Sequence, residues 1–419
     1  MKVLHLIGGK EIAGSKTHLI SLLNQCDRSE VFLCVFDRGE IASEAEALGI
    51  KVFYLKQQTR YDFTVLKKLK NLIKGEKINI LHTHGPRANV FGYLLSKRMP
   101  FIWMTTVHSD PRLDFVGRGL PGWLFTRLHL HVLKSVHHYF AISKRFKEFL
   151  IERQVVPEKI TTIYNGVNFE DTGGMSKSLK TPKVLKPASE FGVELGEIAI
   201  DQKTEKTGER DAALPMGTPP ITREDLGFAK NDFIAITVGR LHPIKGHHFL
   251  FEAFKNAMLI KPEARLSLIV VGDGALRQKL RDETRRLGIH DRVVFVGHQE
   301  NVDPYYALAD IKILSSISES FPLVVLEAAK AKLPVIATDV GGIKELITGR
   351  EYGWVIPPMN GKAMCYAIID ALILHEHGRL KAIGENLFHR AANEYSLDRL
   401  VNKITETYQN MLTQHSCRK

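Results

Sequence analysis

The chain has 419 residues, a net charge of +12 and a composition that is 44% hydrophobic and 25% charged. This length exceeds a single hydrophobic core, so we expect two domains, and no apolar run is long enough to span a bilayer. The cysteines Cys26, Cys34, Cys365 and Cys417 show no CxxC spacing. The absence of this spacing argues against a disulfide framework or a zinc site and favours a reducing, cytoplasmic location.

Short apolar runs alternate with helical patterns through the first 170 residues, which is typical of βαβ units on a parallel sheet. The predicted strands are Val3–Ile7, Val31–Phe36, Val52–Tyr54, Ile78–His82, Phe101–Val107, Tyr139–Ile142 and Ile160–Ile163. The first of them leads into Gly8-Gly9 and Ala13-Gly14-Ser15, a turn that resembles a phosphate-approaching loop but lacks the GxGxxG fingerprint.

Three histidines, His82, His84 and His108, are expected near strand ends. Histidines in such positions are more often structural than catalytic. They could suggest a metal site, but no carboxylate accompanies them at ligand spacing.

The positive charge is concentrated in residues 51–150, which contain 18 Lys/Arg against 5 Asp/Glu. Such a window attracts anions, including lipid headgroups and acidic acceptors, although solvated helix faces explain it equally well. The segment Phe115–Val136 mixes Trp and Leu with Arg and Lys and could dock on a membrane; a core-facing helix is the alternative. A peripheral position at the inner membrane face is therefore compatible with the sequence, and no nucleic-acid partner is expected.

Residues 171–222 lack apolar periodicity and are predicted to be an insertion between the domains. The strand pattern resumes with runs at Asp232–Val238, Leu266–Val271, Val293–Val296, Ile311–Leu314, Val335–Thr338 and Gly353–Ile356. The expected organisation is an N-terminal domain (1–170), the insertion (171–222), a C-terminal domain (223–394) and a last helix (395–419). The fold class is α/β, with two Rossmann-like domains facing each other across a cleft.

Two motifs of the second half carry the chemistry. Glu319 and Glu327 flank Pro322, which is expected to open a helix whose free N–H groups can bind an anion. Arg240 and Lys245 lie in the turn after a strand and can neutralise a diphosphate leaving group. Because no Asp-x-Asp motif occurs in the chain, the sequence does not require a divalent metal for this purpose.

These residues resemble the retaining glycosyltransferases of family 4, which have the GT-B fold. The motifs of the resemblance are Ala13-Gly14-Ser15, Thr106-Val107-His108, Ala141-Ile142-Ser143-Lys144, Tyr164-Asn165-Gly166-Val167-Asn168, Gly239-Arg240 with Lys245-Gly246, Glu319 with Glu327, and Gly341-Gly342 with Glu345. The resemblance covers nearly the whole chain except the insertion. One departure is Lys16, which stands where the family commonly has a glutamate.

The resemblance implies a role for each candidate site residue. Arg240 and Lys245 would hold the donor diphosphate, Glu327 the ribose and Glu319 the transferred sugar, with backbone amides near Phe321, Leu323 and Val324 also contacting the donor. His108 would approach the sugar on the catalytic side, and Gly14 would bring the backbone close to the phosphate or acceptor. The last helix, near Ser396–Thr413, would return to the first domain.

The predicted function is therefore the transfer of a hexose from a nucleotide-diphosphate sugar, a UDP-sugar being favoured, to a polysaccharide or lipid-linked acceptor. Retention of anomeric configuration follows from the resemblance, and no cofactor or metal is expected. A non-catalytic binding scaffold and a nucleotide-sugar epimerase are the alternatives. The base, the sugar and the acceptor stay open.

Overall fold

The computed structural model describes residues 1–9, 14–57, 59, 62–108, 119–169 and 221–416. The chain divides into two compact units. Unit 1 comprises Met1–Asn168 with Tyr395–Lys419, and unit 2 comprises Phe169–Glu394. The predicted insertion at 171–222 falls, except for its last two residues, outside the described part of the chain.

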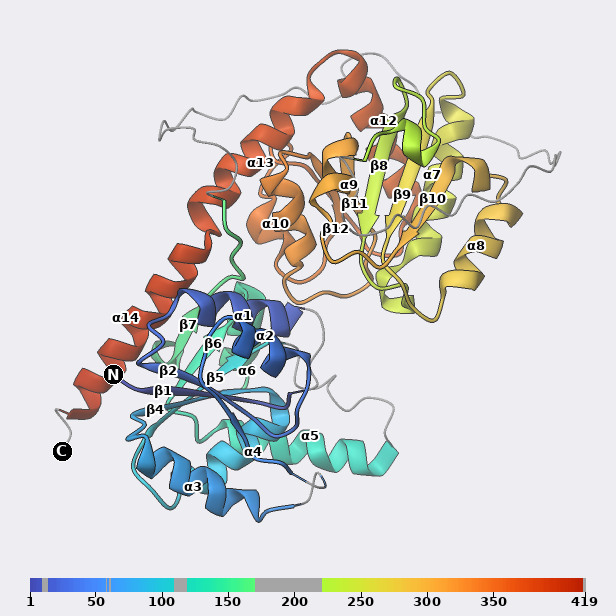
Figure 1. The fold of residues 1–419 in the computed structure, drawn as a ribbon. Coiled ribbons are helices and arrows are strands. Elements are labelled where there is room, and N and C mark those ends of the chain that lie inside the picture. The colour runs from blue at the N-terminus through green and yellow to red at the C-terminus, as the bar shows by residue number, and fades with distance from the viewer. Residues whose placement is uncertain (10–13, 58, 60–61, 109–118, 170–220, 417–419) are drawn as a thin grey trace. The chain divides into compact units, whose positions relative to one another are not determined.

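Unit 1 is built on a seven-stranded parallel sheet with the order β3-β2-β1-β4-β5-β6-β7 (Figure 1). Its strands are β1 (Val3–Ile7), β2 (Val31–Val35), β3 (Val52–Tyr54), β4 (Ile80–His84), β5 (Ile102–Val107), β6 (His138–Ala141) and β7 (Ile160–Thr162). The central strands are buried along their whole length, as expected for parallel strands covered on both faces.

The helices of unit 1 cover both faces of this sheet (Figure 1). They are α1 (Gly14–Gln25), α2 (Glu40–Ala47), α3 (Val65–Gly75), α4 (Gly85–Ser96), α5 (Gly119–Leu133), α6 (Lys144–Glu152) and α14 (Leu397–Ser416). The last helix, α14, packs on α1 and β5 through Leu397, Leu400, Ile404 and Tyr408, an apolar stripe at helical spacing. The C-terminal end of the chain thus completes the first sheet's covering layer.

Unit 2 contains a second parallel sheet, with the order β10-β9-β8-β11-β12-β13. Its strands are β8 (Phe233–Val238), β9 (Leu266–Val271), β10 (Val293–Gly297), β11 (Ile311–Leu314), β12 (Val335–Thr338) and β13 (Trp354–Ile356). The strand order reverses between β8 and β11, which makes this pair the topological switch point of the sheet.

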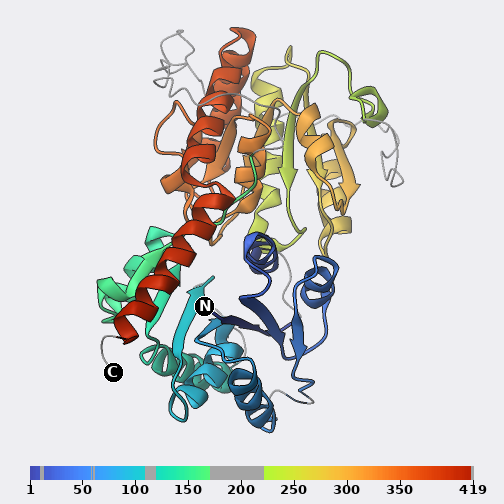
Figure 2. The ribbon, with the colours of Figure 1, turned by 60° about the vertical axis from the view of Figure 1, so that its left-hand side comes forward.

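Helices lie on both sides of the second sheet (Figure 2). They are α7 (His247–Ile260), α8 (Arg277–Arg286), α9 (Asp303–Leu308), α10 (Leu323–Lys330), α11 (Ile343–Leu346), α12 (Gly361–Glu376) and α13 (Leu380–Glu394), with the short 3-10 turn η4 (Pro243–Lys245) after β8. Helix α7 packs on α12 and α10 packs on α13.

The predicted fold class, two Rossmann-like parallel α/β sheets, is confirmed. Two strands are shifted relative to the prediction: β4 runs from Ile80 to His84 where Ile78–His82 was expected, and β6 runs from His138 to Ala141 where Tyr139–Ile142 was expected. His82 therefore lies inside the strand rather than at its end, and His84 is the last residue.

Candidate functional site

The candidate donor residues of unit 2 gather at the carboxyl ends of β8 and β11. Arg240 and Lys245 follow β8, and Glu319 follows β11, its direct neighbour in the sheet. Open α/β sheets bind ligands beyond the carboxyl ends of the strands at this kind of switch point. The topology thus brings together two motifs that are about 80 residues apart in the sequence.

The loop after β8 is fixed against the loop after β11. Ser315 donates a hydrogen bond from its hydroxyl to the carbonyl of Lys245, at 2.8 Å. Gly246 has a φ of 63°, and a Cβ atom there would lie 2.3 Å from the Ser315 carbonyl oxygen. Only glycine fits this close approach, so the backbone that carries Lys245 is held in one place.

Lys245 and Glu319 form an ion pair, with the Lys245 Nζ 2.5 Å from the Glu319 Oε1. The Ser316 hydroxyl donates to the same oxygen, at 2.6 Å. The Lys245 and Glu319 side chains are only 21% and 13% exposed, so water reaches this end of the strands only in part. The pair presents a cation and a carboxylate side by side, where a phosphate and a sugar hydroxyl could each find a partner.

Arg240 lies at the same strand end but differs from Lys245 in its surroundings. It is exposed and forms no ion pair with any described residue. Its guanidinium is therefore available to an anion from outside the unit.

Helix α10 begins one residue later than predicted. Pro322 is the N-cap, with extended backbone angles, and not the first helical residue. The first N–H groups of the helix therefore belong to Leu323 and Val324. These groups have no intrahelical acceptors, as in any first helical turn. Phe321, Leu323 and Val324 therefore lie at the positive end of the helix dipole, beside Glu319 in sequence.

Glu327 lies within α10 and is held by a residue that the sequence did not indicate. Tyr306, from α9, places its hydroxyl 3.2 Å from the Glu327 Oε2 and 3.1 Å from the Val324 carbonyl oxygen. Burial raises the pKa of Glu327, and the Tyr306 hydrogen bond and the Lys312 charge partly oppose this effect. The Tyr306 contact fixes the position of one carboxylate oxygen of Glu327.

Lys312, in β11, is a second group that the sequence analysis did not single out. It is fully buried, and its Nζ has no hydrogen-bond partner among the described residues. Burial lowers its pKa to about 7, with the nearby Lys245 acting in the same direction and Glu327 and Glu319 opposing it. The sequence does contain a signal for this residue, because Lys312 is a charged residue within an apolar run that is predicted to be a strand.

Gly14 and His108 lie in unit 1, apart in sequence and unit from the other candidates. Gly14 is the first residue of α1, and the preceding residues 10–13 lie outside the described part. His108 follows β5 directly and is half-buried, and burial with the neighbouring His18 lowers its pKa well below the usual value. It is therefore a neutral imidazole at physiological pH.

Lys16, the departure from the family pattern, forms ion pairs with two glutamates of α2. Its Nζ lies 2.5 Å from the Glu44 Oε1 and 3.3 Å from the Glu40 Oε2. The lysine thus ties α1 to α2, which is a structural role.

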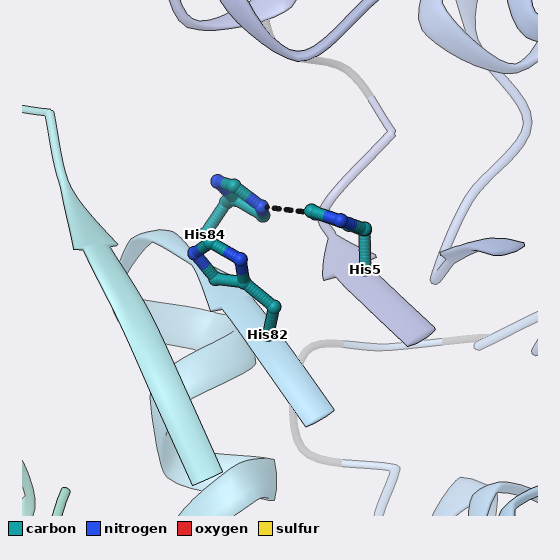
Figure 3. Close-up of side chains that lie close together, drawn as sticks. All are labelled: His5, His82 and His84. Carbon is teal, nitrogen blue, oxygen red and sulfur yellow. Dashed lines mark hydrogen bonds between the residues drawn. The ribbon is translucent and has the colours of Figure 1, made fainter. Parts of the chain in front are cut away.

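Three buried histidines, His5, His82 and His84, have ligand nitrogens within 4.8 Å of one another (Figure 3). His5 comes from β1 and the other two from β4. Every ring nitrogen of the three already has a hydrogen-bond partner in the structure. A metal ion would have to displace several of these bonds, so the cluster is accounted for as a hydrogen-bonded group.

Sequence models of two glycosyltransferase families match the chain. Glycosyltransferase Family 4 matches residues 12–171, and Glycosyl transferases group 1 matches residues 220–387. An uncharacterised glycosyltransferase of Methanocaldococcus jannaschii is 24% identical over 355 residues, which are 82% of this chain and 78% of that protein. The UDP-Gal:alpha-D-GlcNAc-diphosphoundecaprenol alpha-1,3-galactosyltransferase of Escherichia coli is 22% identical over 393 residues, or 90% of each chain.

The same fold is found in HepE of Anabaena, solved in complex with UDP. It has a TM-score of 0.75 and 19% identity to this protein, with 98% of this chain and 100% of HepE covered. At this identity the likeness establishes the fold, while the two family matches establish the class of protein. The chain is a glycosyltransferase of the GT-B type.

Proposed function

We propose that this protein transfers a hexose from a UDP-sugar to a polysaccharide or lipid-linked acceptor of the cell envelope, with retention of anomeric configuration. The observation that carries the proposal is the Lys245–Glu319 pair at the β8/β11 switch point, beside the N-terminus of α10. Residues 223–394 would bind the donor and residues 1–170 the acceptor. The names of similar proteins support the substrate classes: HepE was solved with UDP-glucose, and the Escherichia coli relative uses a diphosphoundecaprenol-linked acceptor.

In the proposed reaction the bond between the anomeric carbon and the diphosphate breaks while the acceptor oxygen attacks. Arg240 and Lys245 stabilise the negative charge that develops on the leaving diphosphate, and the first amides of α10 add to it. Glu327 accepts hydrogen bonds from the ribose diol. His108 contacts the sugar as a neutral imidazole.

We infer a front-face route for retention rather than a covalent intermediate. Glu319 Oε1 is engaged by both Lys245 and Ser316, which suits a hydrogen-bond acceptor for a sugar hydroxyl better than a nucleophile. In the front-face route the donor phosphate takes the proton of the acceptor. Lys245 and Arg240 would supply the positive charge that a metal ion supplies in metal-dependent transferases.

The donor assignment predicts a selective thermal shift. UDP at 100 times its dissociation constant should stabilise the protein by about 2.7 kcal/mol, because it binds the native state alone. GDP and ADP at the same concentration serve as controls, and incubation with UDP-sugars should release free UDP. A changed sugar still attached to UDP would instead indicate an epimerase, and binding without turnover would indicate a scaffold.

An exposed apolar surface on α5 supports a membrane-bound acceptor. The helix buries His129 against the rest of unit 1 but exposes Trp123, Leu124 and Leu128. The guanidinium of Arg127 lies 4.6 Å from the centre of the Trp123 ring. Residues 119–136 of the segment Phe115–Val136 lie in the described part of the chain, and their helix turns one face to the core and exposes the other. Across the described residues, no helix combines the length and apolarity that a membrane crossing needs.

We therefore predict that the protein binds anionic vesicles peripherally through α5. Trp123→Ser with Leu124→Ser should reduce co-sedimentation with vesicles containing anionic lipid by about tenfold, since both side chains lose their apolar contact with the interface. The control is Leu259→Ser on α7, which removes a leucine of unit 2 that is 47% exposed. Binding that ignores the anionic lipid content would contradict the proposal.

A further inference from the structure

Six side chains of unit 1 form one continuous hydrogen-bonded chain that ends at His108. In order, the chain consists of Thr106, His82, Tyr408, His5, His84 and His108. The successive distances are 2.7 Å (Thr106 Oγ1 to His82 Nε2), 2.5 Å (His82 Nδ1 to Tyr408 Oη), 3.4 Å (Tyr408 Oη to His5 Nε2), 3.0 Å (His5 Nδ1 to His84 Nε2) and 3.0 Å (His84 Nδ1 to His108 Nε2). The His5–His84 link is the dashed line in Figure 3.

The fold assembles this chain from parts distant in the sequence. The register of β1 on β4 places His5 directly opposite His82. His84 is two residues further along β4 and so points to the same face of the sheet. Helix α14 covers that face and inserts Tyr408 between His82 and His5, from 326 residues away. Among the described residues of α14, only Tyr408 takes part in this hydrogen-bonded chain.

The hydrogen-bonded chain is shielded from water, and its imidazoles are neutral. His5, His82, His84 and Tyr408 are each at most 2% exposed. Burial lowers the pKa of His5 to about 3 and those of His82 and His84 well below the usual value, and the imidazoles disfavour one another's charge. The other ionisable groups that act on the chain are His18, from α1, His138, from β6, and Cys26, which follows α1.

Neutrality restricts the proton order of the chain. A neutral imidazole has one N–H donor and one bare nitrogen acceptor. The Tyr408 hydroxyl must also donate, because a buried hydroxyl proton without an acceptor costs free energy. Every donor of the hydrogen-bonded chain must then point in the same direction. Only two orders remain, and they differ at the end: His108 carries its proton on Nε2 in one and on Nδ1 in the other.

We propose that Tyr408, His82, His5 and His84 are positioning residues that fix the tautomer and ring orientation of His108. The proposal rests on the proposed function, in which His108 contacts the transferred sugar. The C-terminal helix then has a role at the reacting side of unit 1 in addition to covering the sheet. Because the Nε2 of His108 is bonded to His84, the tautomer decides whether the Nδ1 of His108 donates a hydrogen bond to the substrate or accepts one from it.

The test is Tyr408→Phe, which removes the central oxygen of the chain and keeps the aromatic ring. Nitrogen NMR of 15N-histidine-labelled protein, with His108 assigned by comparison with His108→Gln, should give a ratio of the two His108 tautomers in Tyr408→Phe that differs from the wild-type ratio, because the hydroxyl that couples His82 to His5 is gone. In the same variant kcat should fall by about tenfold, the value of one hydrogen bond, while KM for the UDP-sugar changes by less than about twofold.

Tyr139→Phe is the matched control, because it removes another buried hydroxyl, which donates to the Leu133 carbonyl outside the chain. This variant should keep the wild-type ratio of His108 tautomers and a kcat near that of the wild type. A wild-type tautomer ratio in Tyr408→Phe, or an equal loss of kcat in both variants, would overturn the proposal. If no UDP-sugar is turned over by the wild type, the proposed function fails, and the NMR comparison still decides whether the chain orders His108.

Discussion

Replacing Lys245 with methionine is expected to lower kcat for sugar transfer by about 10² to 10³-fold. The lysine is held beside Glu319 at the β8/β11 switch point, where the leaving diphosphate gains negative charge. Removing one pre-positioned charge from such a site costs about this much, because solvent cannot replace it at the moment of bond cleavage. The measurement is UDP release at saturating UDP-sugar and acceptor.

The control for this variant is Lys279→Met, which removes an exposed lysine from α8 in the same unit. It should leave kcat within a factor of about two, since isolated surface charges contribute little. A Lys245→Met enzyme with an unchanged kcat would remove the assignment of the diphosphate to this strand end.

Glu319→Ala should also lower kcat sharply, because it removes the proposed sugar contact and leaves Lys245 without its partner.

Replacing Lys312 with methionine is expected to stabilise the protein without ligand by about 3 to 5 kcal/mol at pH 6. The side chain is 0% exposed and its Nζ has no hydrogen-bond partner among the described residues. Burial lowers its pKa from 10.5 to about 7, so at pH 6 the folded protein carries the full cost of a buried charge. Methionine keeps the length of the side chain and has no charge. The free energy of unfolding in urea measures the difference.

The sign of the pH dependence follows from the lowered pKa. Between pH 7 and about 10.5 the unfolded chain keeps the Lys312 proton and the folded protein does not, so wild-type stability gains from this group as the pH rises. The advantage of Lys312→Met should therefore be largest below pH 7 and shrink toward pH 10. Lys279→Met should change stability by less than about 0.5 kcal/mol at either pH. A destabilised Lys312→Met protein at pH 6 would show that the lysine has a compensating partner.

Strand positions could be predicted well because parallel strands in this fold are continuous apolar runs. Val3–Ile7, Leu266–Val271, Ile311–Leu314 and Val335–Thr338 occur as predicted. Their apolar composition is a local property that one sequence contains. Helix α13 was not predicted, although Leu380, Ile383 and Leu387 lie on one buried face.

The candidate donor residues could be named from the sequence, but their partners could not. Nothing in the sequence indicates that Tyr306 contacts Glu327, because α9 and α10 meet only through tertiary packing. His5 is one polar residue in an apolar strand, and its pairing with His82 depends on the register of β1 on β4. The Tyr408 contact depends on where α14 packs, which a single helical pattern does not specify.

The account depends on the donor lying at the carboxyl ends of β8 and β11, and a crystal structure of the UDP complex tests this most directly. The account predicts the diphosphate within hydrogen-bonding distance of Lys245, Arg240 and the first amides of α10, with the ribose diol on the Glu327 carboxylate. UDP bound to unit 2 away from these residues, or bound to unit 1 alone, would contradict it.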